Sequence, residues 1–117
     1  MNSNENIREY FNAIRNRQKA LLSAYTDTRE DSPDKTVAEL VSRIGHDEAR
    51  LAVAELLNVV GEWDGRISRK NRGWALTVEG AETGEEQNKH GIYLPSSPHP
   101  AHIDQIADAM RKLDENR

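Results

Sequence analysis

Cysteine is absent from the 117 residues, which excludes a disulfide framework, a cysteine-based zinc site and a thiol nucleophile. The aromatic residues are two Trp, three Tyr and one Phe, so a core must consist mainly of Leu, Ile, Val and Ala. The longest apolar stretch, residues 51–60, is interrupted by Glu55 and Asn58 and is shorter than the ~20 residues that span a bilayer. The polar N-terminus lacks the apolar region of a signal peptide. We therefore expect a single cytoplasmic domain without a membrane segment.

Neither charge nor motifs indicate an enzyme. The sequence holds 16 Lys and Arg residues against 20 Asp and Glu residues, so its net charge is −4. That balance favours solubility and does not indicate a nucleic-acid binder. The sequence also lacks the G-x-S-x-G motif of serine hydrolases, the G-x-x-x-x-G-K phosphate loop and the G-x-G-x-x-G dinucleotide fingerprint. We predict no catalytic residue and no cofactor.

Apolar residues recur at helical spacing along most of the chain. A first stripe predicts a long helix over about residues 4–25 that is interrupted only by Gln18. Its members are Ile7, Tyr10, Phe11, Ile14, Leu21, Leu22 and Tyr25. Residues 26–35 contain no aliphatic side chain and predict a linker. The rest of the chain, residues 36–117, is expected to form the core of the domain.

Capping signals divide this core into helices. Thr36 and Glu39 fit a capping box at the start of a short helix. Asp47 is expected to cap the next helix, which runs to Val60. Its stripe contains Ala49, Ala52, Val53, Leu56, Leu57 and Val60. Because further apolar residues lie on its other sides, we expect this helix to be at the centre of the bundle.

Two tryptophans follow the expected central helix. Ser68 predicts the cap of a helix that contains Trp74 and ends at Gly80. Thr83 begins a second possible capping box and a short helix. We expect Trp63 and Trp74 to pack inward on either side of a turn and to join the central helix to the next one.

The C-terminal part combines an extended segment with a last helix. Gly91–Pro100 holds three prolines and predicts an extended arm, from which Ile92–Leu94 reaches the core. The last stripe consists of Ile103, Ile106, Ala107, Met110 and Leu113. The sequence therefore predicts an all-α, compact single-domain bundle of five to six helices with a Pro-rich arm before the last helix.

The clearest candidate binding site is a basic segment, residues 66–74. It ends in an aromatic residue and carries four cations, Arg66, Arg69, Lys70 and Arg72. Such a segment can bind phosphates while the indole stacks on a base. The alternative is an ordinary solvated helix start in which Ile67 and Trp74 face inward.

Three histidines form a second candidate site. His90, His99 and His102 lie within thirteen residues, close to Asp104, and imidazole with carboxylate is a ligand set for zinc or nickel. However, Pro100 separates two of the histidines, and His99 is expected at the cap of the last helix. We therefore predict capping or surface histidines and no metal.

Acid–base chemistry has one candidate pair, Glu62 and Asp64 on either side of Trp63. An apolar neighbour raises the pKa of a carboxyl group, which is a way to make a general acid. Two acidic residues in a turn are also common in surface loops, so this pair does not predict an enzyme.

Residues 37–110 contain four stretches that resemble a known group of proteins: Val41–Ala49, Trp63–Ser68, Asn71–Ala75 and Pro100–Ile106. They are similar to uncharacterised proteins of gut Firmicutes, typically carried by phages and integrative conjugative elements. The resemblance implies a mobile-element context and no catalytic residue. Small helical proteins in that context often bind a host or element protein, and inhibitors of host defence such as anti-CRISPR proteins are among them.

Three classes of function remain from the sequence. The favoured one is a non-enzymatic interaction protein whose partner is a protein or a ribonucleoprotein. We expect its contact surface to join the basic segment to the arm around His90–His99. The alternative is a nucleic-acid-binding accessory that uses Arg66–Trp74, although the net charge of −4 does not favour direct DNA binding. A small metal-dependent enzyme is the third class.

Overall fold

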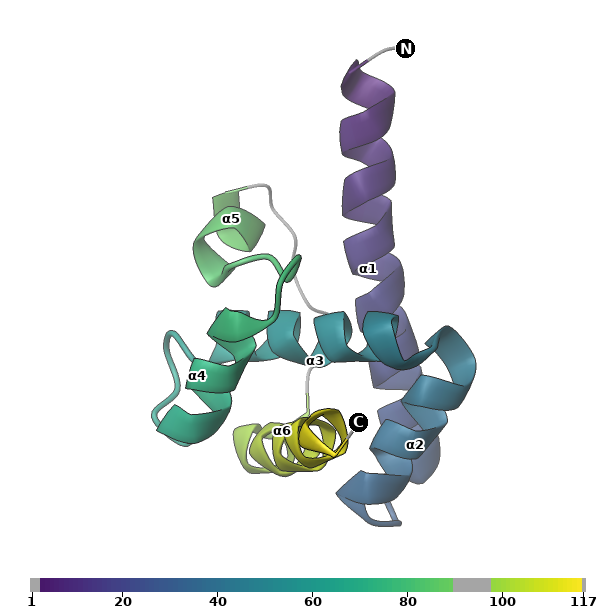
Figure 1. The fold of residues 1–117 in the computed structure, drawn as a ribbon, viewed down its shortest axis with the longest axis vertical. Helices are drawn as coiled ribbons and strands as arrows, with labels where there is room; N and C mark the ends of the chain where they lie inside the picture. The colour runs from purple at the N-terminus through teal and green to yellow at the C-terminus, as the bar shows by residue number, and fades with distance from the viewer. Residues whose placement is uncertain (1–2, 90–97, 117) are drawn as a thin grey trace.

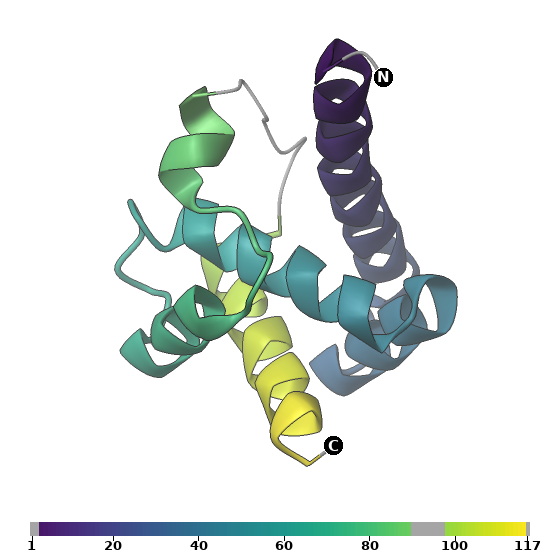
Figure 2. The same ribbon diagram turned by 45° about the horizontal axis from the view of Figure 1, so that its top comes forward.

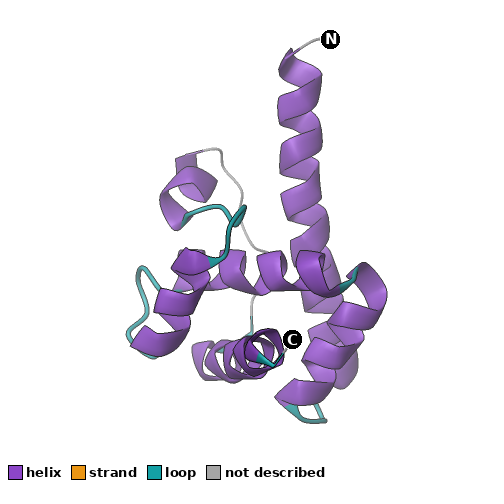
Figure 3. Ribbon diagram, in the orientation of Figure 1, coloured by secondary structure: helices purple, strands orange, loops and turns teal. Residues whose placement is uncertain are grey.

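The computed structural model describes residues 3–89 and 98–116. These residues form six helices and no strand, which confirms the predicted all-α bundle (Figures 1 and 3). In chain order the helices are α1 (Ser3–Thr28), α2 (Pro33–Ile44), α3 (His46–Val60), α4 (Arg69–Thr77), α5 (Gly84–Lys89) and α6 (Pro100–Glu115). None of these helices combines the length and the apolar character needed to cross a membrane.

Helix α3 lies at the centre of the bundle (Figure 1). It packs against each of the other five described helices, and every residue from Ala52 to Val60 is buried. A helix that is covered on all sides needs apolar side chains on all sides, as its sequence has. The prediction that this helix forms the core is confirmed.

One charged residue of α3 is also buried. The Glu55 side chain is fully buried and forms two bonds with Arg17 of α1, 2.9 Å from Nε to Oε1 and 2.8 Å from Nη2 to Oε2. The backbone N–H of Glu82 donates to the same carboxylate at 3.3 Å. Buried charges are tolerated when they are paired and hydrogen-bonded in this way. Glu55 thereby joins α1 and the loop before α5 to the central helix.

Helix α1 packs on the body from Ile14 onward. Apart from Gln18, its buried positions alternate in spacing between three and four residues: Ile14, Arg17, Leu21, Ala24 and Thr28. The N-terminal half extends past the other helices, and Ile7 and Tyr10 on the same stripe are about half exposed (Figures 1 and 2). Gln18 does not break the packing, because it is buried and its Nε2 donates to the carbonyl oxygen of Ala52 at 3.0 Å.

The predicted linker over residues 26–35 is wrong in extent. Helix α1 continues to Thr28, and only residues 29–32 separate it from α2. Ser32 caps α2 and a proline follows it in the first turn, so the cap lies four residues before the predicted capping box. Thr36 is instead buried inside α2, where its hydroxyl contacts that of Thr28. Through Thr28, the packing of α1 on α2 extends into the predicted linker.

The junction between α2 and α3 is a single glycine. Gly45 has a φ of +85°, which is the positive region that glycine occupies most easily, and its N–H donates to the Val41 carbonyl at 2.8 Å. Helix α3 starts at the next residue and has no side-chain cap. The prediction that Asp47 is this cap is therefore wrong, and Asp47 lies in the first turn of the helix instead.

Three other predicted helix starts are confirmed. Ser68 and Thr83 each accept a hydrogen bond from the backbone N–H three residues later, at 3.2 Å in both cases. His99 accepts from the N–H two residues later through Nδ1, at 3.1 Å. The predicted arm over residues 91–100 lies outside the described residues up to residue 97, and so does its apolar segment Ile92–Leu94.

The prediction that both indoles pack inward is wrong for Trp63, which is 68% exposed. Helix α3 ends at Val60, and the N–H groups of Trp63 and Asp64 both donate to the carbonyl oxygen of Val60. After this turn the chain no longer follows the helical spacing that predicted an inward position for Trp63. Ile67, which is 2% exposed, takes the place in the core instead.

Candidate interaction surface

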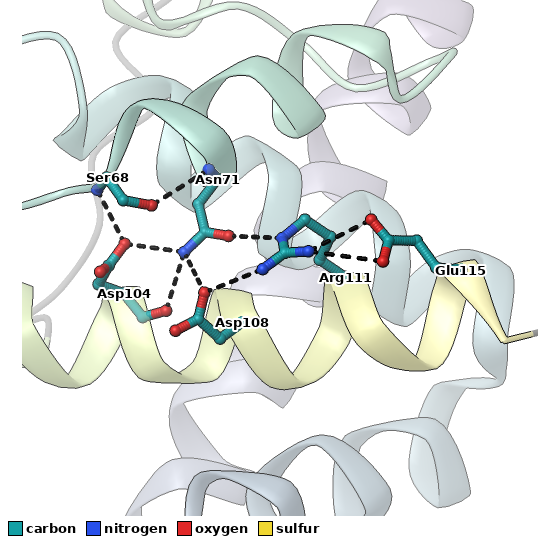
Figure 4. A network of polar contacts seen from close by, with 6 residues as sticks. All are labelled: Ser68, Asn71, Asp104, Asp108, Arg111 and Glu115. Atoms are coloured by element: carbon teal, nitrogen blue, oxygen red, sulfur yellow. Dashed lines mark hydrogen bonds and ion pairs between the residues drawn. The ribbon is translucent and has the colours of Figure 1, made fainter.

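A network of polar contacts fixes α4 on α6 (Figure 4). Asn71 is fully buried, and its amide nitrogen lies 2.8 Å from an oxygen of Asp104 and 2.9 Å from an oxygen of Asp108. Its amide oxygen accepts from Nε of Arg111 at 3.0 Å. The backbone N–H of Ser68 donates to the Asp104 carboxylate at 2.9 Å. The buried amide thus has partners for both its donor and its acceptor, which makes α4 a well-positioned element.

The other end of α4 is held by Asp114. The indole N–H of Trp74 donates to this carboxylate at 3.1 Å, and Arg50 Nε and His46 Nε2 lie 2.9 Å and 3.2 Å from it. Burial raises the pKa of Asp114, but the hydrogen bonds from Arg50, Trp74 and His46 outweigh it and hold the pKa below its ordinary value. Trp74 is therefore half-buried and structural, in agreement with the inward position predicted for it.

The opposite side of α4 faces solvent. Arg69, Lys70 and Arg72 are exposed, and their side chains have no hydrogen bond or ion pair within the described part of the chain. A Cβ atom on Gly61 would lie 3.1 Å from Cγ of Arg72, so the stem of Arg72 packs on the turn that carries Trp63. We call this surface the α4 face, and its members are Trp63, Arg69, Lys70, Arg72 and Leu76.

Arg66 is not a free cation like its neighbours. Its guanidinium forms a bidentate pair with Asp64, 3.0 Å from Nε to Oδ1 and 2.8 Å from Nη2 to Oδ2. These bonds and the backbone N–H of Arg66 lower the pKa of Asp64 to about 2. Asp64 is therefore ionised at neutral pH, which argues against the interpretation of Glu62 and Asp64 as an acid–base pair.

The described histidines are occupied by contacts within the fold. His99 caps α6, and its Nε2 lies 3.1 Å from Nη1 of Arg66. His102 Nδ1 is 2.7 Å from the hydroxyl of Tyr25, and the two histidine rings are 6.3 Å apart. In residues 3–89 and 98–116, no three His, Cys, Asp or Glu side chains are placed to hold a metal ion. His90 lies outside those residues.

The site therefore combines three unpaired cations with exposed apolar side chains on a fixed helix. Guanidinium groups pair with carboxylates or phosphates, and an exposed indole and leucine provide apolar contact area. The cations were predicted from the sequence, but the role of Asn71, whose burial leaves the cations on the outer side, was not. The sequence around Asn71 did not indicate that this side chain is buried, because its hydrogen-bond partners lie about 35 residues further along the chain.

No curated protein and no solved structure matches the sequence. One family model matches residues 3–115, which is nearly the whole chain. The chain therefore belongs to the family described as protein of unknown function (DUF3849).

Proposed function

We propose that this protein is a non-enzymatic interaction protein that binds another protein through the α4 face. The observation that carries the proposal is the combination, on one anchored helix and the adjoining turn, of unpaired Arg69, Lys70 and Arg72 with the 68% exposed Trp63. Trp and Arg are the residues most often found at the energetic centres of protein interfaces. A helix held by a buried network also loses little conformational freedom on binding.

A protein partner fits the charges better than a nucleic acid does. The three cations are matched by carboxylates on an acidic protein surface. Glu62 and the ionised Asp64 lie in the turn beside them, and the chain as a whole carries a net charge of −4. A nucleic acid carries negative charge along its whole length and is opposed by the net charge of −4, whereas a protein partner can place a few carboxylates opposite the three cations. A nucleic-acid-binding accessory that uses residues 66–74 remains the second candidate, because three of the four cations of this segment, Arg69, Lys70 and Arg72, are unpaired among the described residues.

We propose that this protein is carried by a mobile genetic element and acts in the cytoplasm of the host cell. The support is the resemblance over about residues 37–110 to proteins carried by phages and integrative conjugative elements. A small binding protein in that setting can block a host or element protein, and inhibition of host defence, as by anti-CRISPR proteins, is one such role. The partner is then a protein or a ribonucleoprotein with an acidic surface.

Site-specific photocrosslinking in the native host tests the proposal. A photoreactive amino acid replaces Trp63 in one variant and Leu113, an exposed residue of α6, in the control. We expect a discrete protein adduct from position 63 only. The adduct should disappear in the R69E/K70E variant and persist in K35E/K112E, which reverses two exposed cations elsewhere.

Three outcomes would contradict the proposal. Equal adducts from positions 63 and 113 would show that the α4 face is not selective. An adduct that survives R69E/K70E would show that the cations do not contribute. An adduct that nuclease digestion removes would identify the partner as nucleic acid.

A further inference from the structure

A cleft opens beside the α4 face. It has a volume of about 200 Å³ and lies where α4 and the start of α5 meet the C-terminal end of α3. Leu57, which is almost fully buried, lies at its base, and Glu62, Arg72 and the 71% exposed Leu76 contribute to its walls. The cleft is thus apolar within and charged at its edge.

Two glycines give the cleft its shape. A Cβ atom at Gly84 would overlap the backbone oxygen of Asn58 and the carboxyl group of Glu62, so α5 can approach α3 only because residue 84 has no side chain. Gly61 leaves room for the stem of Arg72, whose Cγ would lie 3.1 Å from a Cβ atom at position 61. Because the close approach at Gly84 involves the backbone of Asn58, this side of the cleft exists before a ligand arrives.

The polar atoms of the cleft fall into two groups. Asn58 Nδ2 donates to the carbonyl oxygen of Glu82 at 2.9 Å, and Thr83 Oγ1 accepts from the N–H of Glu86 at 3.2 Å, so both side chains are already paired. The carboxylate of Glu62 and the guanidinium of Arg72 have no partner among the described residues. A ligand would therefore meet one free anion and one free cation.

We infer that the cleft receives a single apolar side chain of the protein partner, next to a carboxylate of the same segment that pairs with Arg72. This inference rests on the proposed function. A volume of about 200 Å³ is below the ~300–1,000 Å³ of small-molecule sites and suits one leucine-sized side chain. Arg69 and Lys70 extend the positive charge along α4, whereas Glu62 repels a carboxylate on its own side. The partner segment should therefore carry its carboxylates on the side that faces α4.

Small probes test the cleft with the purified full chain. We choose N-acetyl-leucine, which has both features, N-acetyl-leucine methylamide, which lacks the carboxylate, and N-acetyl-serine, which lacks the apolar side chain. In amide-resolved NMR titrations, N-acetyl-leucine should shift Gly61, Leu76 and Gly84 saturably. We expect N-acetyl-serine to bind about tenfold more weakly and the methylamide about threefold more weakly.

Variants then assign the two features to residues. R72Q should abolish the preference for N-acetyl-leucine over its methylamide, and L76A should weaken both leucine probes. The matched controls are K112Q and L113A, which change an exposed cation and an exposed leucine on α6 and should leave both affinities unchanged.

The inference is wrong if N-acetyl-serine binds as tightly as N-acetyl-leucine, or if R72Q retains the preference. It is also wrong if adenosine monophosphate shifts the same amides at lower concentration, since a base would then be the occupant. These titrations need no partner protein. If the probes do not bind as expected, the cleft inference fails, but the crosslink from position 63 still tests the proposed function. Conversely, if no crosslink forms from position 63, the proposed function is contradicted, whether or not the cleft binds the probes.

Discussion

Replacing Asn71 by aspartate tests how α4 is held on α6. The substitution keeps the size of the side chain and an oxygen that accepts from Arg111, but it exchanges the amide donor for a second carboxylate oxygen. That oxygen would face the oxygens of Asp104 and Asp108, which lie 2.8 Å and 2.9 Å from the native amide nitrogen. Two attractive contacts become repulsive in a fully buried position.

The cost follows from these contacts. Each lost hydrogen bond to a charged acceptor is worth about 1.5–3 kcal/mol. Two carboxylates ~4 Å apart repel by about 4 kcal/mol at an effective dielectric constant of ~20. The neighbouring guanidinium of Arg111 offsets part of this repulsion, and the terms overlap. We therefore expect N71D to lower the free energy of unfolding by about 3–5 kcal/mol.

Guanidinium titration followed by far-ultraviolet circular dichroism measures this loss. The control is N12D, at an exposed position of α1, for which we expect a change below about 0.5 kcal/mol. The new carboxyl group at position 71 has a raised pKa in the folded state. Its penalty is thus fully present above that pKa and shrinks as the pH falls toward the unfolded value of about 3.9. A loss below about 1 kcal/mol at neutral pH, similar to that of N12D, would refute the role of Asn71.

The same titration checks three further expectations. L56A should cost about 2–5 kcal/mol, because Leu56 is 1% exposed in the central helix, and a smaller loss would show that α3 is not the core. On α1, I14A should cost about 2–5 kcal/mol and I7A less than about 1 kcal/mol, because Ile14 is fully buried and Ile7 is half exposed; equal losses would contradict the described packing. Since the pKa of Asp114 is lowered, its stabilisation is present above about pH 4 and is lost as the pH falls through the lowered value. The stability difference between wild type and D114N should therefore narrow on acidification, and a constant difference would count against this ion pair.

Local patterns in the sequence predict much of this fold. The stripe of α3 is visible because an interior helix needs apolar residues at helical spacing on every side. The caps Ser68, Thr83 and His99 are visible because each satisfies a backbone donor two or three residues away. In both cases the physical cause lies within a single helix, so one segment of sequence contains it.

Features that depend on contacts between helices, or on the course of the chain through a turn, were not predicted. Glu55 interrupts the apolar stretch in the sequence but is buried, because Arg17 reaches it from 38 residues away. The outward position of Trp63 depends on the turn after Val60, which ends the helical periodicity used to place it inward. Among the basic residues, the sequence could not separate Arg66, which Asp64 neutralises, from the cations that remain free.

The most direct test of the central claim is the affinity of the α4 face for its partner. Once the adduct from position 63 has identified the partner, calorimetric titration compares wild type, R69E/K70E and K35E/K112E. We predict that R69E/K70E weakens binding at least about tenfold and that K35E/K112E binds like wild type. Equal affinities for the two double variants would contradict the claim that this protein acts through the α4 face.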